Sequence, residues 1–152
     1  MWFICWIIDY IAITTDLNKA IASASRHIKM NFFDKLLLAI EHHQSLLYAE
    51  LDPDPQMLSD AGKGEGMGRL WEWLDFAIAH TSELVCAYKF TLDFYQALGA
   101  AGLELFQKTL AAIPPHIPVI LDAKHSDVNT STVFARTVFE DWYFDACTVL
   151  PY

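Results

Sequence analysis

Apolar residues recur along much of the chain at the three-to-four-residue spacing of an amphipathic helix. In the first such stretch they stand at positions 32, 33, 36, 37 and 40, with Asp34 and Lys35 between them, and Asn31 is suited to cap a helix. The same spacing returns further along the chain. The predicted helices cover residues 31–43, 70–82, 94–98, 103–113 and 132–142.

Short apolar runs alternate with these helices and are typical of buried parallel strands. The predicted strands cover residues 45–51, 84–90, 119–121 and 146–150. Strands separated by helices predict an α/β fold with a parallel sheet and right-handed crossovers. About four such strands with flanking helices correspond to part of a (β/α)8 TIM barrel. A small open doubly wound sheet is the alternative, but its glycine-rich first turn is missing.

Two stretches do not share this pattern. Residues 1–29 are strongly apolar at first, but the run contains Asp9, is too short to span a bilayer and lacks a basic leader. We interpret residues 1–29 as an extension without a role in the fold, and residues 30–152 as the domain. Residues 56–69 carry four alternating glycines without phosphate-loop spacing, which predicts a mobile, variable loop.

Composition narrows the possible functions. The chain of 152 residues is 54% apolar and has a net charge of -9, which indicates a globular protein and disfavours nucleic-acid binding. Cys5, Cys86 and Cys147 form no closely spaced pair, and two of them stand in apolar runs. They are predicted to be reduced core residues, with no disulfide or metal framework, in a cytoplasmic protein without a membrane segment.

Charged residues gather where the predicted strands end. They are Asp52, Lys89, Asp122, Lys124 and Asp127. The carboxyl ends of parallel strands open on one edge, so these groups are expected to share one mouth, each ammonium keeping a neighbouring carboxylate ionised. An ammonium fixed beside a carboxylate can protonate a developing carbanion, which favours decarboxylation or proton transfer next to a carbonyl. A surface network of salt bridges is the other interpretation.

Several motifs resemble orotidine 5'-phosphate decarboxylase. The main ones are Leu51-Asp52-Pro53-Asp54-Pro55, Ala87-Tyr88-Lys89 and the run Leu121-Asp122-Ala123-Lys124-His125-Ser126-Asp127. Residues 94–99, 102–105 and 145–149 add to the likeness, which covers residues 30–152. The chain is most similar to the longer bacterial branch, which includes forms fused to orotate phosphoribosyltransferase.

The resemblance implies an enzyme that makes UMP and CO2 from orotidine 5'-phosphate without a metal or another cofactor. Lys124 would be the general acid that protonates C6 of the pyrimidine. Asp122 would press on the substrate carboxylate and orient Lys124, and Lys89 would bridge Asp122 and the ribose.

The resemblance also implies substrate contacts and a homodimer. Asp52 would bind a ribose hydroxyl, and Thr130 would contact the ribose or phosphate. Asp127 would reach across the dimer interface into the partner's site. The chain departs from the family pattern at Glu50, where glycine is usual, and at His125-Ser126, where Arg-Gly is commoner.

The resemblance covers only the amino-terminal half of the family's barrel. The phosphate-binding half and any fused phosphoribosyltransferase domain have no counterpart, so we expect a truncated fragment that is inactive alone and prone to association. Two alternatives remain. One is a sugar-phosphate decarboxylase or aldolase-type relative that uses Mg²⁺, with Asp54 or Glu50 as ligands. The other is a non-enzymatic gene fragment.

Overall fold

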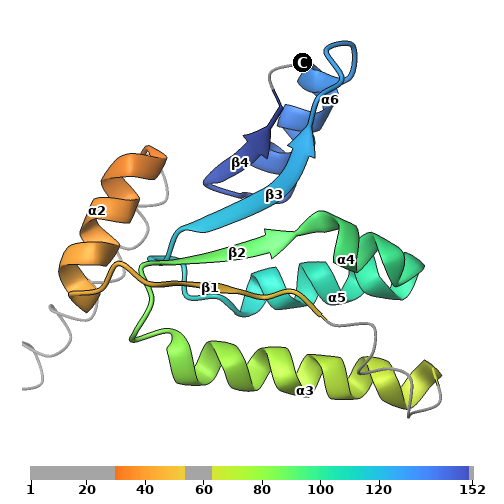
Figure 1. Cartoon of the computed structure of the whole chain (residues 1–152), viewed down its shortest axis with the longest axis horizontal. Coiled ribbons are helices and arrows are strands. Elements are labelled where there is room, and N and C mark those ends of the chain that lie inside the picture. Colours follow the sequence, from red (N-terminus) through yellow and green to blue (C-terminus); the bar gives the residue numbers. More distant parts are fainter. Residues whose placement is uncertain (1–29, 54–62, 151–152) are drawn as a thin grey trace, which may run out of the picture. The chain divides into compact units, whose positions relative to one another are not determined.

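The computed structural model describes residues 30–53 and 63–150 (Figure 1). The chain divides into two compact units, Met1–Asn31 and Phe32–Tyr152, and the fold below is that of the second. The predicted extension at residues 1–29 lies outside the described residues, as does Asp54. No helix in the described ranges is long and apolar enough to cross a membrane.

Helices and strands alternate along the chain. The helices are α2 (Phe32–His43), α3 (Lys63–Thr81), α4 (Leu92–Ala97), α5 (Gly99–Ala112) and α6 (Ser131–Arg136), which runs on into the π-helical turn η2 (Thr137–Asp141). The strands are β1 (Tyr48–Glu50), β2 (Ala87–Thr91), β3 (Val119–His125) and β4 (Ala146–Val149).

The four strands form one parallel sheet in the order β1-β2-β3-β4. This confirms the predicted α/β fold. Each strand pairs with the next one along the chain, as in a barrel wall, whereas a doubly wound sheet reverses its strand order partway. In the described residues β1 and β4 are the two outer strands.

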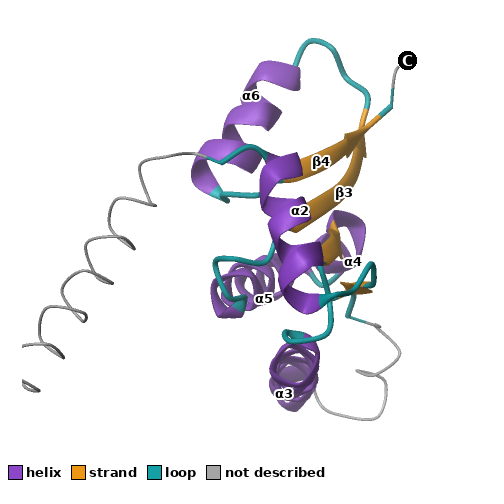
Figure 2. Ribbon diagram, turned by 90° about the vertical axis from the view of Figure 1, so that its left-hand side faces the viewer, coloured by secondary structure: helices purple, strands orange, loops and turns teal. Residues whose placement is uncertain are grey.

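Helices α3 and α5 cover one face of the sheet (Figures 1 and 2). Strand residues alternate between the faces, so Tyr88 and Phe90 are fully buried while Lys89 between them stays partly exposed. The core also includes residues of several helices: Leu70, Leu74, Ile78, Tyr95, Leu105, Phe106 and Val138. The polar residues of the strands therefore lie on the other face.

The predicted loop at residues 56–69 is wrong for residues 63–69, because α3 begins at Lys63 and not at residue 70. Glycine disfavours helix, but the cost is about 1 kcal/mol per residue, and tertiary packing can offset it. Leu70, Leu74 and Ile78 stand four residues apart and are almost fully buried in the core. Their burial stabilises a helix that extends back through the glycines.

Other element boundaries also shift. Strand β1 is shorter than predicted, and β2 begins at Ala87 although Cys86 N–H still donates to the carbonyl of Leu47. Strand β3 runs to His125 and so includes both Asp122 and Lys124. The predicted helix at 132–142 is α6 followed by the wider turn η2, where Trp142 N–H donates to the carbonyl of Thr137.

Candidate active site

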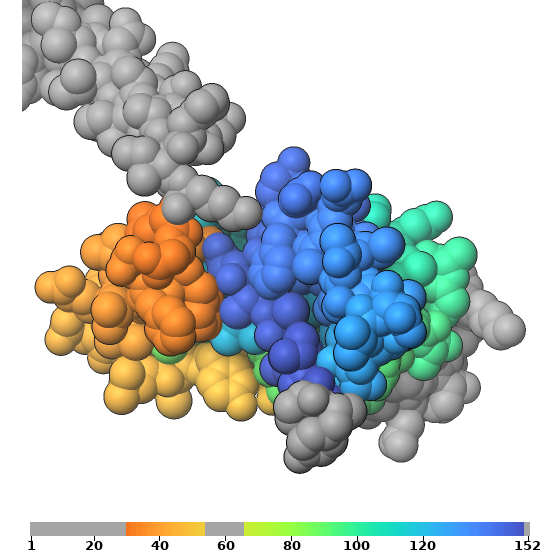
Figure 3. Space-filling view, turned by 90° about the horizontal axis from the view of Figure 1, so that it is seen from above, coloured from red at the N-terminus to blue at the C-terminus, as the bar shows by residue number. Residues whose placement is uncertain are grey.

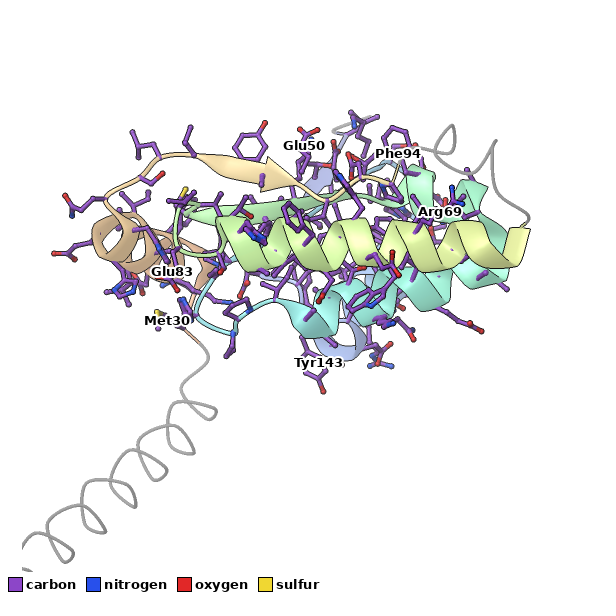
Figure 4. The ribbon with its side chains drawn as sticks, turned by 90° about the horizontal axis from the view of Figure 1, so that it is seen from below. Met30, Glu50, Arg69, Glu83, Phe94 and Tyr143 are labelled. Carbon is purple, nitrogen blue, oxygen red and sulfur yellow. The ribbon has the colours of Figure 1, made fainter. Side chains whose placement is uncertain are left out.

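Three of the predicted site residues meet at the carboxyl ends of β2 and β3. Lys124 Nζ lies 2.8 Å from Asp122 Oδ2, and Lys89 Nζ lies 3.6 Å from the same oxygen. Lys89 Nζ also lies 2.7 Å from Glu50 Oε1 on β1. Carboxylates and ammonium groups thus alternate across three strands, with Glu50 marking the position in Figure 4.

Strand geometry explains why these side chains converge. Asp122 and Lys124 are two residues apart on β3, so both project from one face of the sheet. The register aligns Glu50 with Lys89 and Thr91 with Asp122. This is the face that α3 and α5 leave uncovered.

A local irregularity in strand β3 affects the direction of the Lys124 side chain. The pairing of β3 with β4 shifts register between Leu121 and His125, and Lys124 has a positive φ of 46°. A side-chain-bearing residue in this region is strained, and bulges of this kind often redirect a side chain near a functional site. Here the bulge coincides with the contact between Lys124 and Asp122.

Thr148 of β4 stabilises this arrangement. Its hydroxyl donates to Asp122 Oδ1 at 2.6 Å and accepts the backbone N–H of Lys124 at 3.0 Å. One side chain therefore holds both the carboxylate and the strained backbone. The sequence interpretation missed Thr148, although its position two residues after Ala146 on a parallel strand places it on the same face.

The network keeps its members charged. Hydrogen bonds from Lys124 and then Thr148 lower the pKa of Asp122, and the nearby ammonium charges act in the same direction. The hydrogen bond to Glu50 raises the pKa of Lys89, against the opposing effect of burial. Asp122 is only 12% exposed whereas Lys124 is 60% exposed. A fixed carboxylate thus stands beside an ammonium that is open to an incoming molecule.

Asp52 follows β1 and contacts a different group. Its Oδ1 accepts the backbone N–H of Thr91 and its Oδ2 accepts the Thr91 hydroxyl, both at 2.7 Å. Thr91 is the residue before α4, so Asp52 ties the end of β1 to the start of that helix. The structure brings Asp52 to the same edge of the sheet, and among the described residues it has no ion pair with Lys89 or Lys124.

Asp127 and Thr130 lie in the exposed loop after β3. Thr130 Oγ1 donates to Asp127 Oδ2 at 2.7 Å, and Asn129 N–H donates to Asp127 Oδ1 at 3.0 Å. The bond from Thr130, followed by that from Asn129, lowers the pKa of Asp127. These bonds order the loop, and none of those in the described part joins Asp127 to Lys89 or Lys124.

The structure bears on the predicted Mg²⁺ ligands as well. Glu50, one of the two, accepts a hydrogen bond from Lys89, and a cation beside that ammonium would be repelled. A hollow of about 640 Å³ lies away from these charges, at the amino-terminal edge of the sheet beside Lys35, Pro114 and Asp145. The site is therefore identified by its charges and not by a cavity.

The geometry suits the loss of a carboxylate from a bound molecule. A substrate carboxylate placed near Asp122 would be repelled by it, and that repulsion would end when the carboxylate leaves as neutral CO2. The ammonium of Lys124 could then protonate the carbon that keeps the electron pair.

Comparisons with known proteins find similar sequences among orotidine 5'-phosphate decarboxylases. The chain is 60% identical over 124 residues to the bifunctional enzyme PyrF/PyrE of Nostoc sp., an alignment that covers 81% of this chain and 26% of that protein. It is 43% identical to the orotidine 5'-phosphate decarboxylase of Dehalococcoides mccartyi, over 81% of this chain and 44% of that protein. No family model matches.

Solved structures agree with the sequence comparisons. The UMP synthase of Leishmania donovani superposes with a TM-score of 0.70 and 32% identity, over 82% of this chain and 26% of that one. The Leishmania donovani OMP decarboxylase gives 0.67 and 30%, over 81% and 45%. The chain spans less than half the length of these relatives. Over 81% of its own length it is homologous to part of the orotidine 5'-phosphate decarboxylases.

Proposed function

We propose that this chain carries the decarboxylating centre of an orotidine 5'-phosphate decarboxylase. One observation carries the proposal: the ammonium groups of Lys89 and Lys124 meet the same carboxylate oxygen of Asp122, at 3.6 and 2.8 Å. The homology supports it, since relatives 43% and 44% identical to this chain are named orotidine 5'-phosphate decarboxylase. The product would be UMP, in pyrimidine biosynthesis, and the cytoplasm would be the compartment.

In the proposed reaction the bond between C6 and the carboxylate breaks and its electron pair stays on C6. CO2 leaves, and Lys124 donates a proton from Nζ to C6, so that UMP forms and Lys124 becomes neutral. A proton from solvent then restores the ammonium, which the high exposure of Lys124 favours. Asp122 raises the energy of the bound carboxylate and orients Lys124.

The remaining candidates would bind and position the substrate. Lys89 would link Asp122 to the ribose, and Asp52 would accept a ribose hydroxyl while Thr91 holds it in place. Thr130 would contact the ribose or phosphate. Asp127 would reach into the partner's site of a homodimer, for which its exposed loop provides room.

We further propose that the reaction needs more of a barrel than these four strands. The face that carries Lys124 has no covering layer in the described residues, and the relatives are more than twice as long as the matched region. Binding energy from parts of a substrate remote from the reacting atoms normally lowers the barrier. The four strands lack the surfaces that would bind those remote parts of the substrate. We therefore expect turnover by the chain alone to be at least about 10³-fold slower than turnover by a full-length relative.

The test joins this chain to the remaining decarboxylase part of the Nostoc relative and measures UMP formation. The fusion should be active, and Lys124→Ala should reduce kcat by at least about 10³-fold. Lys108→Ala is the matched control, because Lys108 lies over the Trp71 ring, 3.8 Å from its centre, on the helix-covered side. It should keep full activity.

Two results would overturn the proposal. One is a fusion in which Lys124→Ala turns over as fast as Lys108→Ala. The other is a well-folded fusion that binds a UMP analogue only when Mg²⁺ is added, which would favour the metal-dependent alternative. Turnover by residues 1–152 alone at the rate of a full-length relative would contradict the requirement for a larger barrel.

A further inference from the structure

A second group of ionisable side chains gathers at the opposite edge of the sheet. His42 and His43 end α2, Glu83 lies between α3 and β2, and His116 lies between α5 and β3. All of these segments come before a strand, and the amino-terminal ends of parallel strands share one edge. This edge is remote from Lys124, so the inference does not rest on the proposed decarboxylation.

The side chains are close enough to act together. The possible ligand atoms of His42, His43 and Glu83 all lie within 4.8 Å of one another. The His116 ring centre lies 5.8 Å from that of His43, with the two rings stacked, and 6.0 Å from that of His42. Figure 4 shows Glu83 beside the end of α2.

One imidazole nitrogen of this group is unsatisfied among the described residues. His43 Nε2 is buried and has no hydrogen-bond partner among the described residues. A buried polar atom without a partner costs about 1–3 kcal/mol, so its presence calls for an explanation. Histidines near a helix end are common, but that placement alone does not explain why a third imidazole from a separate loop packs against both.

The donor types indicate the class of ligand. Imidazole nitrogens together with one carboxylate oxygen suit Zn²⁺ and similar transition cations, whereas Mg²⁺ and Ca²⁺ prefer oxygen ligands alone. The nearby ammonium of Lys35 is neutralised by Asp145 at 2.7 Å, which reduces its repulsion of a cation. The ligand atoms would have to move together, because Zn–N distances are about 2.0–2.1 Å.

We propose that His42, His43 and Glu83 bind a Zn²⁺-type divalent cation, with His116 as the fourth donor. The cation would fasten the end of α2 to the loops before β2 and β3. Its role would be structural, since the amino-terminal edge of such a barrel wall is associated with stability and not with catalysis. It would give His43 Nε2 the partner that it lacks.

The site can be tested by titrating the metal-free chain with Zn²⁺ in a calorimeter and with Co²⁺ in a visible spectrophotometer. We expect one cation per chain with a Kd in the micromolar range, intense tetrahedral Co²⁺ bands and a Tm that rises with Zn²⁺ concentration. His43→Gln and Glu83→Gln should each weaken binding by about 10-fold or more. Glu83 is exposed, so its variant should fold normally.

His80→Gln is the matched control. His80 is an exposed imidazole on α3, where its ring stacks on Phe76 and its Nδ1 contacts the Phe76 carbonyl. This variant should bind Zn²⁺ as the unchanged chain does, and alkylating the thiols beforehand should not weaken binding. Equal affinity in the Glu83→Gln and His80→Gln variants, loss of binding after alkylation, or no saturable binding up to about 1 mM would each overturn the proposal.

Discussion

Asp122 shows how one residue can organise a charged site. Its Oδ2 faces two ammonium groups, and its Oδ1 accepts the hydroxyl of Thr148. Three strands therefore depend on a single carboxylate that is nearly buried. Removing its charge would leave Lys124 without its partner, so the effect on stability should depend on pH.

The pH dependence of stability has a definite sign. Hydrogen bonds from Lys124 and Thr148 lower the pKa of folded Asp122, so its stabilisation is complete above the unfolded pKa and is lost as pH falls through the folded value. At pH 7 we expect Asp122→Asn to lower the free energy of unfolding by about 1 kcal/mol. The difference in stability should narrow as the pH falls below the unfolded value of 3.8 and toward the lower folded value.

Urea unfolding measured at several pH values checks this prediction. Asp75→Asn is the control, because Asp75 is exposed on α3. A stability difference between Asp122→Asn and the unchanged chain that stays constant from pH 7 to pH 2 would contradict the proposed coupling.

At the scale of elements, two glycines in helices have opposite constraints. A Cβ on Gly102 of α5 would lie 2.0 Å from the Tyr95 carbonyl oxygen and 2.5 Å from Leu98 Cβ. A Cβ on Gly68 of α3 would meet nothing within 4 Å. Gly102 is thus required by the close packing of α4 on α5, and Gly68 is not required by packing.

The same substitution should therefore have opposite effects at the two positions. Gly102→Ala should lower the free energy of unfolding by about 2–3 kcal/mol, because helix backbone would have to move. Gly68→Ala should raise it by about 0.5–1 kcal/mol, because alanine favours a helix interior. Denaturant unfolding of the two variants side by side measures both, and destabilisation of equal size would show that α4 and α5 do not pack as described.

A partly buried ion pair joins helix α2 to the sheet. Lys35 Nζ lies 2.7 Å from Asp145 Oδ2, and that oxygen also accepts the backbone N–H of Val119. Figure 3 shows the orange surface of α2 beside the dark-blue surface of the last part of the described chain. Asp145 thus joins α2 to the beginnings of β3 and β4.

Breaking this ion pair should lower the free energy of unfolding more than breaking an exposed ion pair would. Asp145→Ala should lower the free energy of unfolding by about 2 kcal/mol, because Lys35 and the Val119 N–H both lose a partner. Arg136→Ala removes the exposed ion pair between Arg136 of α6 and Glu140 of η2 and should change the free energy of unfolding by less than about 0.5 kcal/mol. Thermal and denaturant unfolding distinguish the two, and equal effects would contradict the role assigned to Asp145.

At the scale of the whole described domain, apolar groups gather near both outer strands. Leu46 and Leu47 before β1 are 79% and 68% exposed, and Val149 at the end of β4 is 62% exposed. Outer strands also present unpaired backbone groups, which favour association between sheets. The surface that a closed barrel would bury is therefore open in the described residues.

We expect the purified chain to associate as its concentration rises. Sedimentation velocity should show oligomers at micromolar concentrations, and the double variant Leu46→Lys/Leu47→Lys should shift the distribution toward monomer, because charges beside an outer strand oppose pairing. Phe76→Lys, which changes an exposed aromatic residue on α3, should have little effect. A monomer at all concentrations, or equal shifts in both variants, would refute the prediction.

Much of the fold was predictable from the chain because helix and strand periods are local properties. The spacing of apolar residues predicted the order of helices and strands and the parallel sheet, although α3 begins earlier than its glycines suggested. The charged residues that follow the predicted strands likewise indicated the edge of the sheet at which Lys89, Asp122 and Lys124 meet. These features depend on near neighbours in the sequence, so they could be inferred without coordinates.

The pairing within the site was decided only by the tertiary structure. Asp52 binds Thr91 and, within the described ranges, forms no ion pair with Lys89 or Lys124. Thr148 joins Asp122 to the backbone of Lys124. The cluster of His42, His43, Glu83 and His116 also forms only when three separate connections meet. Sequence spacing determines the face on which a side chain lies. Its partner depends on the register between strands and on the packing of loops, which bring together residues far apart in the chain.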